Sequence, residues 1–171
     1  MSGKRKTKRL EPPDTHHLRA AVGWLELGNA REAKVEWEQI SAAGREHPGV
    51  LEVRWSIHAH AKEWDACLEI AGSLIERFPQ RAAGWIHRSY ALHEMKRTQE
   101  ARECLLPAAA QFPKHAIIAY NLACYACQLG DREEARQWLR AAMRRGTKAE
   151  IRRMAREDPD LAPLREEIDR L

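Results

Sequence analysis

A spacing of 34 residues recurs along the chain at positions that hold small side chains. Ala33, Cys67, Ala101 and Ala135 follow one another at this interval, three times in succession. A fixed period of this length predicts a stack of similar units, each of which buries its apolar face only against its neighbours. The small residue has a physical reason, because two helices that cross closely would be pushed apart by a larger side chain.

Almost every segment after residue 14 has the periodicity of a helix. Apolar residues recur at spacings of three and four, and the alternation typical of a strand does not persist. We expect Asp14 or Thr15 to be the first N-cap, because two prolines stand just before them. The predicted helices lie near residues 15–27, 30–45, 49–61, 64–77, 81–95, 98–111, 115–129 and 131–145.

Turn-forming residues separate these helices. Gly28 and Gly130 favour the left-handed backbone that ends a helix inside a hairpin. Prolines end one hairpin and begin the next at Pro48, Pro79 and Pro113. Pro48 comes three residues later than the period predicts. We therefore expect a longer second helix in the first hairpin and a shorter first helix in the second.

The residues in phase with the period resemble the tetratricopeptide repeat family. The residues that fit its pattern are Ala21, Gly28, Ala33 and Trp37 in the first unit, Trp85, Ser89, Ala101, Leu105 and Pro113 in the third, and Ala123, Gly130, Ala135 and Leu139 in the fourth. The second unit departs from the pattern, because Trp55 stands where the family has a small residue. The resemblance covers residues 15–146 and implies an all-α fold, an α-α superhelix of four helical hairpins.

Two further segments flank the repeats. Residues 1–14 are expected to form a flexible basic arm, since residues 1–10 carry five Lys or Arg and no acid. The net charge is +4, so residues 11–171 together carry −1. Residues 147–171 are predicted to be capping helices, because a stack of repeats leaves its last apolar face open. Ile151, Met154, Leu161, Leu164 and Ile168 have the spacing that this role requires.

No constellation of residues in the sequence predicts an enzyme. Neither GxGxxG nor GxxxxGK is present, and we find no nucleophile paired with a base. Cys124 and Cys127 form a CxxC, but a structural zinc site normally needs four ligands and a thioredoxin-like motif follows a strand. His87 and His93 lie about 240° apart around a helix, which does not suit chelation. We expect no catalytic residue, no metal and no cofactor.

The family resemblance implies a concave groove lined by the first helix of each hairpin, which commonly holds an extended peptide or a partner helix. The predicted groove residues are Arg19, Trp55, His87, Tyr90, His93, Tyr120, Asn121, Cys124 and Gln128. Tyr90, Tyr120 and Trp55 would be aromatic anchors, and Asn121 would bond a ligand backbone in both directions. The alternative for Trp55 and Tyr90 is that they pack between first helices.

These observations predict a non-catalytic protein-interaction module, which would be an adaptor, scaffold or assembly factor. The alternative is contact with nucleic acid or an acidic partner through the basic arm, with the repeats as a docking or dimerisation platform. No apolar run reaches the roughly 18 residues of a membrane helix, and the charged start lacks the apolar stretch of a secretory signal. Four cysteines suit a reducing compartment, so we expect the protein in the cytoplasm.

Overall fold

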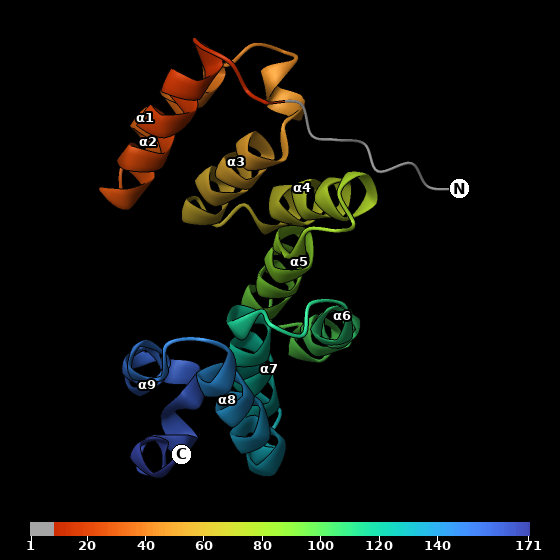
Figure 1. The fold of residues 1–171 in the computed structure, drawn as a ribbon, viewed down its shortest axis with the longest axis vertical. Coiled ribbons are helices and arrows are strands. Elements are labelled where there is room, and N and C mark those ends of the chain that lie inside the picture. Colours follow the sequence, from red (N-terminus) through yellow and green to blue (C-terminus); the bar gives the residue numbers. More distant parts are fainter. Residues whose placement is uncertain (1–8) are drawn as a thin grey trace. The chain divides into compact units, whose positions relative to one another are not determined.

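A computed structural model describes residues 9–171 (Figure 1). The regular structure of this part of the chain is entirely helical. The chain divides into two compact units, Met1–Arg81 and Ala82–Leu171. The basic residues 4–8 of the predicted arm lie outside the described residues. None of the described helices is both long and apolar enough to cross a membrane.

The helices keep the period of the sequence. The first helices of the four hairpins are α1 (Asp14–Glu26), α3 (Pro48–His60), α5 (Ala82–Glu94) and α7 (Ala116–Gln128), each of 13 residues. The second helices are α2 (Ala30–Glu38), α4 (Trp64–Arg77), α6 (Thr98–Gln111) and α8 (Arg132–Arg145). Both series begin at intervals of 34 residues, which confirms the predicted all-α repeat architecture.

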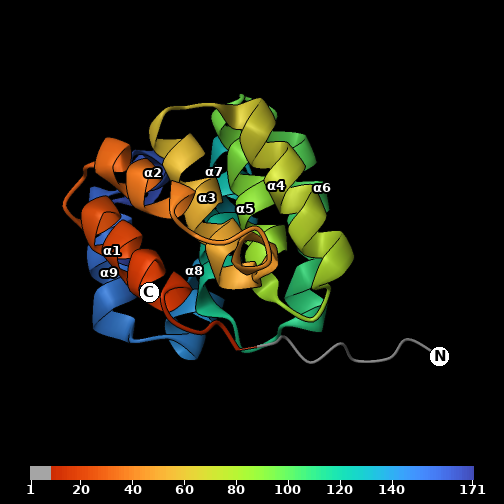
Figure 2. The ribbon, with the colours of Figure 1, turned by 90° about the horizontal axis from the view of Figure 1, so that it is seen from above.

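In the first unit, α1 lies beside α2 and α3 pairs with α4 (Figure 2). Ala33 and Cys67, two of the residues that define the period, are completely buried. Burial raises the pKa of the Cys67 thiol to about 11, so this cysteine stays protonated and packs as a small side chain. The Trp37 indole lies against this core and donates a hydrogen bond to the carbonyl of Val50 over 3.2 Å.

The second helix of the first hairpin is shorter than the sequence predicts. It ends at Glu38 after nine residues, and a 3-10 turn, η1 (Gly44–Glu46), precedes α3. The prediction of a longer second helix was therefore wrong. The prediction of a shorter first helix in the next hairpin was also wrong, because α3 has the same length as α1. The residues that α2 lacks relative to α4 lie in the loop between α2 and α3, and Pro48 is the first residue of α3.

A carboxylate on α1 fixes this loop. Asp14 Oδ1 accepts a hydrogen bond from the Ser41 amide at 2.9 Å, and Oδ2 accepts one from the Ser41 hydroxyl at 2.5 Å. Gly44 lies so close to Asp14 that a Cβ atom there would clash with the carboxylate. The expectation that Asp14 or Thr15 caps α1 was wrong, because Pro13 occupies the N-cap position and the Asp14 side chain binds the loop.

In the second unit, α5 pairs with α6 and α7 with α8, and Ala101 and Ala135 are completely buried between them. The turns inside the first and fourth hairpins confirm the prediction for Gly28 and Gly130, whose φ angles are +74° and +88°. The chain continues through α9 (Lys148–Glu157) and two 3-10 turns, η2 (Pro159–Leu164) and η3 (Ile168–Arg170). The residues of this segment with no exposed surface are Ala155, Leu161, Leu164 and Ile168.

Candidate functional site

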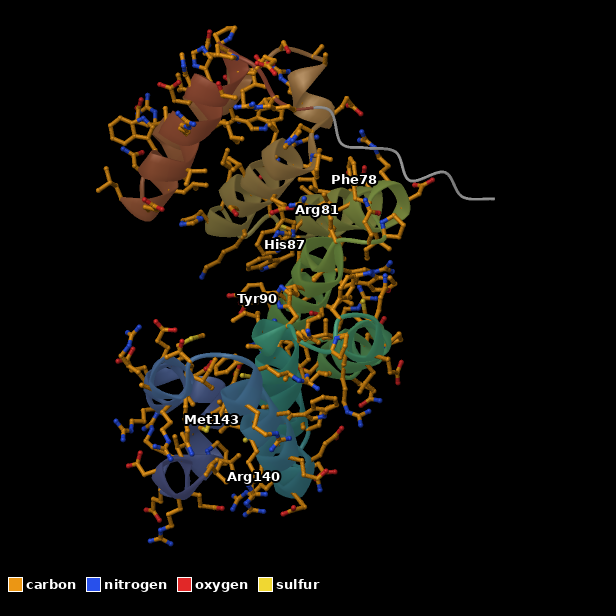
Figure 3. All side chains as sticks on the ribbon, in the orientation of Figure 1. Phe78, Arg81, His87, Tyr90, Arg140 and Met143 are labelled. Carbon is orange, nitrogen blue, oxygen red and sulfur yellow. The ribbon has the colours of Figure 1, made fainter. Side chains whose placement is uncertain are left out.

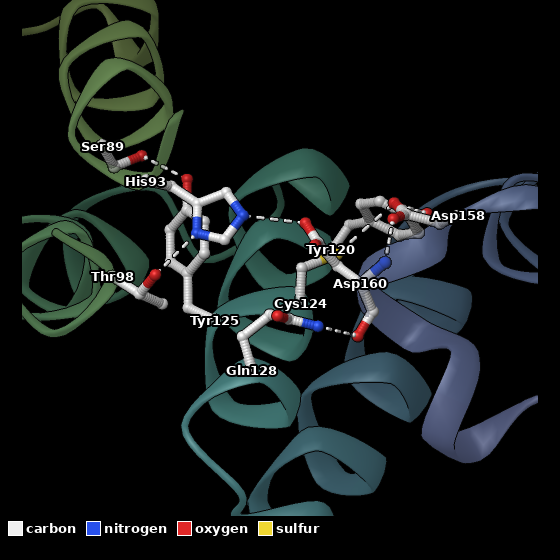
Figure 4. Close-up of polar contacts among 9 residues, drawn as sticks. All are labelled: Ser89, His93, Thr98, Tyr120, Cys124, Tyr125, Gln128, Asp158 and Asp160. Atoms are coloured by element: carbon white, nitrogen blue, oxygen red, sulfur yellow. Dashed lines mark hydrogen bonds and ion pairs between the residues drawn. The ribbon is translucent and has the colours of Figure 1, made fainter. Parts of the chain in front are cut away.

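One face of α7 presents polar side chains at intervals of four residues. Tyr120, Cys124 and Gln128 lie one turn apart and therefore share a face of the helix. His93, in the last turn of α5, completes a cluster that we call the α7 site. These four residues all belong to the groove predicted from the sequence. In the structure they contact the chain's own η2 segment (Figure 4).

Asp158 is the first acid held by the α7 site. Its Oδ2 accepts a hydrogen bond from the Tyr120 hydroxyl at 2.8 Å and a longer one from the Cys124 thiol at 3.6 Å. Its Oδ1 accepts from the backbone amide of Asp160 at 2.9 Å and so caps η2. The carboxylate is half-buried, and three donors from the protein replace the water that burial removes.

Asp160 is the second acid of the segment and meets the α7 site through two groups. Its Oδ2 lies 2.8 Å from Nε2 of His93, and its backbone carbonyl accepts a hydrogen bond from the Gln128 amide at 2.9 Å. Because a carboxylate only accepts, Nε2 carries a proton in this arrangement. His93 is 8% exposed as a residue, and its other ring nitrogen lies 3.0 Å from the Thr98 hydroxyl, which fixes the ring.

The Tyr125 ring packs against the ring of His93. The two ring centroids are 5.0 Å apart, and the Tyr125 hydroxyl donates to the Ser89 hydroxyl over 3.1 Å (Figure 4). Ser89 stands at one of the small-residue positions of the repeat and is completely buried. The position of His93 is therefore set by packing between α5 and α7.

The electrostatic environment keeps the donors of the site protonated. Burial, and then the charge of Asp158, raises the pKa of the Cys124 thiol well above its ordinary value. Burial likewise raises the pKa of the Tyr120 hydroxyl. The pKa of Cys127 is shifted in the same direction by burial. A raised pKa keeps a thiol or hydroxyl protonated at neutral pH, and the Tyr120 hydroxyl and the Cys124 thiol both donate hydrogen bonds to Asp158.

Three potential metal ligands meet in the α7 site. The ligand atoms of Cys124, Asp158 and Asp160 all lie within 4.8 Å of one another. Each of them already has a hydrogen-bond partner, and those bonds account for the arrangement without an ion. The sequence did not point to this cluster, because its acids lie on a separate segment more than 30 residues after Cys124.

The other predicted groove residues lie outside this cluster. In the first unit Arg19 is exposed, whereas Trp55 is buried and its carbonyl accepts a hydrogen bond from the Cys67 thiol. In the second unit Asn121 and His87 are half-buried. Burial lowers the pKa of His87 to about 4.

Tyr90 is the exposed aromatic residue beside the α7 site. It is 41% exposed and projects from α5 on the side away from α6 (Figure 3). Partial burial, and then the charge of Glu94, raises the pKa of its hydroxyl, and the charges of Asp160 and Asp158 act in the same direction. The first-helix surface of the second unit thus continues from the occupied α7 site to an exposed tyrosine.

The comparisons with known proteins identify the fold. No protein-family model matches the chain, and no curated protein matches it by sequence. Among solved structures, a thermophilic TPR protein of Thermus thermophilus, TTC0263, superposes with a TM-score of 0.76 at 21% identity, over 92% of this chain and 84% of that one. A mutant of MamA gives a TM-score of 0.56 at 18% identity over 76% of each chain.

A second MamA structure, of MSR-1, gives a TM-score of 0.59 at 17% identity, over 78% of this chain and 76% of that one. Similarity at these levels of identity concerns the fold. Together with the helix register and the buried small residues at the 34-residue interval, it shows that the chain has a tetratricopeptide-repeat-type fold.

Proposed function

We propose that the chain is a non-catalytic protein-interaction module and that the face formed by its first helices holds a peptide or a partner helix. One observation carries this proposal. The first-helix face of the second unit already holds a peptide segment, Asp158–Leu164, through hydrogen bonds from side chains of α5 and α7.

The chemistry of that contact supports peptide binding. Gln128 binds a backbone carbonyl, Tyr120 and His93 bind carboxylates, and Leu161 and Leu164 are completely buried. Backbone, charged and apolar groups of one short segment are thus all bound by the same unit. These are the three kinds of contact that a peptide-binding surface must offer.

The exposed part of the same face is where a partner would bind beside the occupied site. Tyr90 offers a large amphipathic side chain there, and tyrosine is enriched among the residues that dominate binding energy. In the first unit, Arg19 is exposed on the first helix α1. The alternative role of the basic arm remains a prediction, since residues 1–8 lie outside the described part of the chain.

A capture experiment with paired variants tests the proposal. Tagged full-length protein, Tyr90→Ala and Arg140→Ala would each be incubated with lysate of the native cells, with and without nuclease. Arg140 is the matched control, because it is exposed on the second helix α8. We expect a protein partner that the wild type and Arg140→Ala retain and that Tyr90→Ala retains at least tenfold less.

Equal retention by all three proteins would contradict binding through the first-helix face of the second unit. Capture that disappears with nuclease, and with deletion of residues 1–10, would support the basic arm instead.

A further inference from the structure

The C-terminal segment, residues 158–171, has a charge opposite to that of the helices on which it lies. It contains five Asp or Glu and two Arg, for a net charge of −3. Residues 132–157, which include α8 and α9, contain nine Lys or Arg and four Glu, for a net charge of +5. The Arg136 guanidinium donates to both carboxylate oxygens of Glu167, at 2.6 and 3.1 Å, and Arg156 pairs with Asp169.

This segment makes polar contacts that a purely apolar cap would not need. Leu161, Leu164 and Ile168 have no exposed surface, and apolar burial of this kind is what the closing of an open repeat face requires. Asp158 and Asp160 lose part of their hydration beside the α7 site, which costs free energy unless donors replace the water. Tyr120, Cys124 and His93 are those donors, and all three come from first helices.

The positions of these donors require two carboxylates at a defined spacing in the bound segment. The carboxylate of Asp158 is held by α7 and that of Asp160 by α5, while Asp158 also caps the turn between them. The first apolar residue, Leu161, follows immediately after the second acid. A segment fits this site when two carboxylates stand two residues apart in a turn and a leucine follows.

Resting on the function proposed above, we infer that the α7 site is a recognition site for acidic segments of the form Asp-Xaa-Asp-Leu, and that such a segment of a partner protein binds there by displacing Asp158–Leu164. The chain's own segment is then an intramolecular competitor. A tethered segment acts at an effective concentration on the order of millimolar, so it sets a threshold that the partner must exceed.

The probe for this inference is a fluorescein-labelled peptide with the sequence of residues 157–171. Its affinity would be measured by fluorescence anisotropy with three full-length proteins: the wild type, Asp158→Asn/Asp160→Asn, and Glu157→Gln/Glu166→Gln. The last is a charge-matched control, because both of its glutamates are exposed and away from the α7 site contacts. Asparagine keeps the size of aspartate and removes the charge that the site binds.

We expect Asp158→Asn/Asp160→Asn to bind the probe at least tenfold more tightly than the wild type and the control. Adding Tyr120→Phe to that variant should lower the affinity again, and a probe with both aspartates replaced by asparagine should not bind. Equal affinity of the three full-length proteins, each confirmed as helical by circular dichroism, would overturn the inference. A dimer of the double variant that exchanges C-terminal segments would also overturn it, because the occupant would then be a second copy.

Hydrogen exchange of the wild-type chain gives a second readout that does not depend on a variant's folding. If the segment is displaceable, the amides of residues 160–162 and 164 open at lower free energy than those of residues 120–128, and excess peptide increases the difference. Exchange of both stretches only through one common unfolding would make the segment a fixed cap and overturn the inference. Loss of partner capture by Tyr90→Ala together with that result would leave the proposed function standing.

Discussion

The hydroxyl of Tyr120 donates a hydrogen bond over 2.8 Å to Oδ2 of Asp158, which lies 38 residues further along the chain. Tyr120 is buried on α7, and Asp158 begins the turn that lies across it. This contact joins the first-helix face of the repeats to the C-terminal segment.

Removing the Tyr120 hydroxyl should destabilise the protein. Tyr120→Phe leaves the ring in place but deprives a half-buried carboxylate of a donor, which costs about 1.5–3 kcal/mol for a bond to a charged group. The free energy of unfolding would be measured by urea denaturation at pH 7. Tyr90→Phe is the control, with an expected loss below about 0.5 kcal/mol at this exposed position. Similar losses for both variants would mean that the contact with Asp158 contributes little.

A bulky residue at a close helix crossing should be tolerated poorly. Ala101 is completely buried between the helices of the third hairpin, so Ala101→Trp should cost at least about 1–3 kcal/mol by overpacking. Ala110→Trp, on an exposed position of the same helix, is the matched control. Thermal unfolding would compare the two. An unchanged melting temperature for Ala101→Trp is incompatible with the assigned repeat phase.

The conformation of the loop after α2 should require glycine at position 44. Gly44→Ala would place a Cβ atom against the Asp14 carboxylate and the Ile40 side chain, and we expect a loss of about 1–3 kcal/mol. Gly23→Ala is its counterpart, because no atom lies within 4 Å of a Cβ at that helical position. It should stabilise the protein by about 0.5–1 kcal/mol. Opposite signs in urea denaturation would support the described loop, and equal effects would contradict it.

His87, a half-buried histidine of α5, should make stability fall as the pH falls. The pKa of His87 is lowered from 6.5 to about 4 by burial, so between these values the unfolded chain binds a proton that the folded chain does not. Stability therefore decreases from pH 7.5 to pH 4.5, by at most about 3 kcal/mol from this group.

Two variants isolate this effect. His87→Gln, which cannot be protonated, should flatten the pH dependence of the free energy of unfolding between pH 7.5 and 4.5. His16→Gln, at an exposed position, should leave the slope unchanged. A wild-type slope in His87→Gln would show that burial of His87 does not govern stability in this range.

Much of the repeat architecture could be predicted from the sequence, because its information is local and periodic. Small residues at the 34-residue interval mark close helix crossings, and Gly28 and Gly130 mark turns with positive φ. Each signal marks a turn or a helix crossing within one hairpin, and the small residue recurs from one hairpin to the next. The four helical hairpins followed from them.

The loop after α2 could not be predicted in the same way. Residues up to 45 have a helical pattern, but the helix ends at Glu38 because Ser41 in the loop donates hydrogen bonds to Asp14, 27 residues before it. A contact between segments far apart in the sequence produces no periodic pattern of residues. Pro48 comes three residues later in the period than Pro79 and Pro113 do. This offset indicated an irregularity between the first two hairpins, but we wrongly assigned it to the lengths of the two flanking helices.

The candidate site was predicted in part. The phase of the repeat placed Tyr120, Cys124 and Gln128 on one helix face, which the structure shows in contact with a common segment. Asp158 and Asp160 were assigned to a cap without any role at this face. Their contacts depend on how α9 returns the chain to α7, and no local pattern specifies that path.

Site-specific photo-crosslinking in the native cells tests the central claim most directly. Benzoylphenylalanine would replace Tyr90, on the first helix α5, and in a second strain Gln137, which is exposed on the second helix α8. The account predicts a crosslinked protein partner from position 90 and none from position 137. Crosslinks to a partner from position 137 with none from position 90 would contradict binding through the first-helix face.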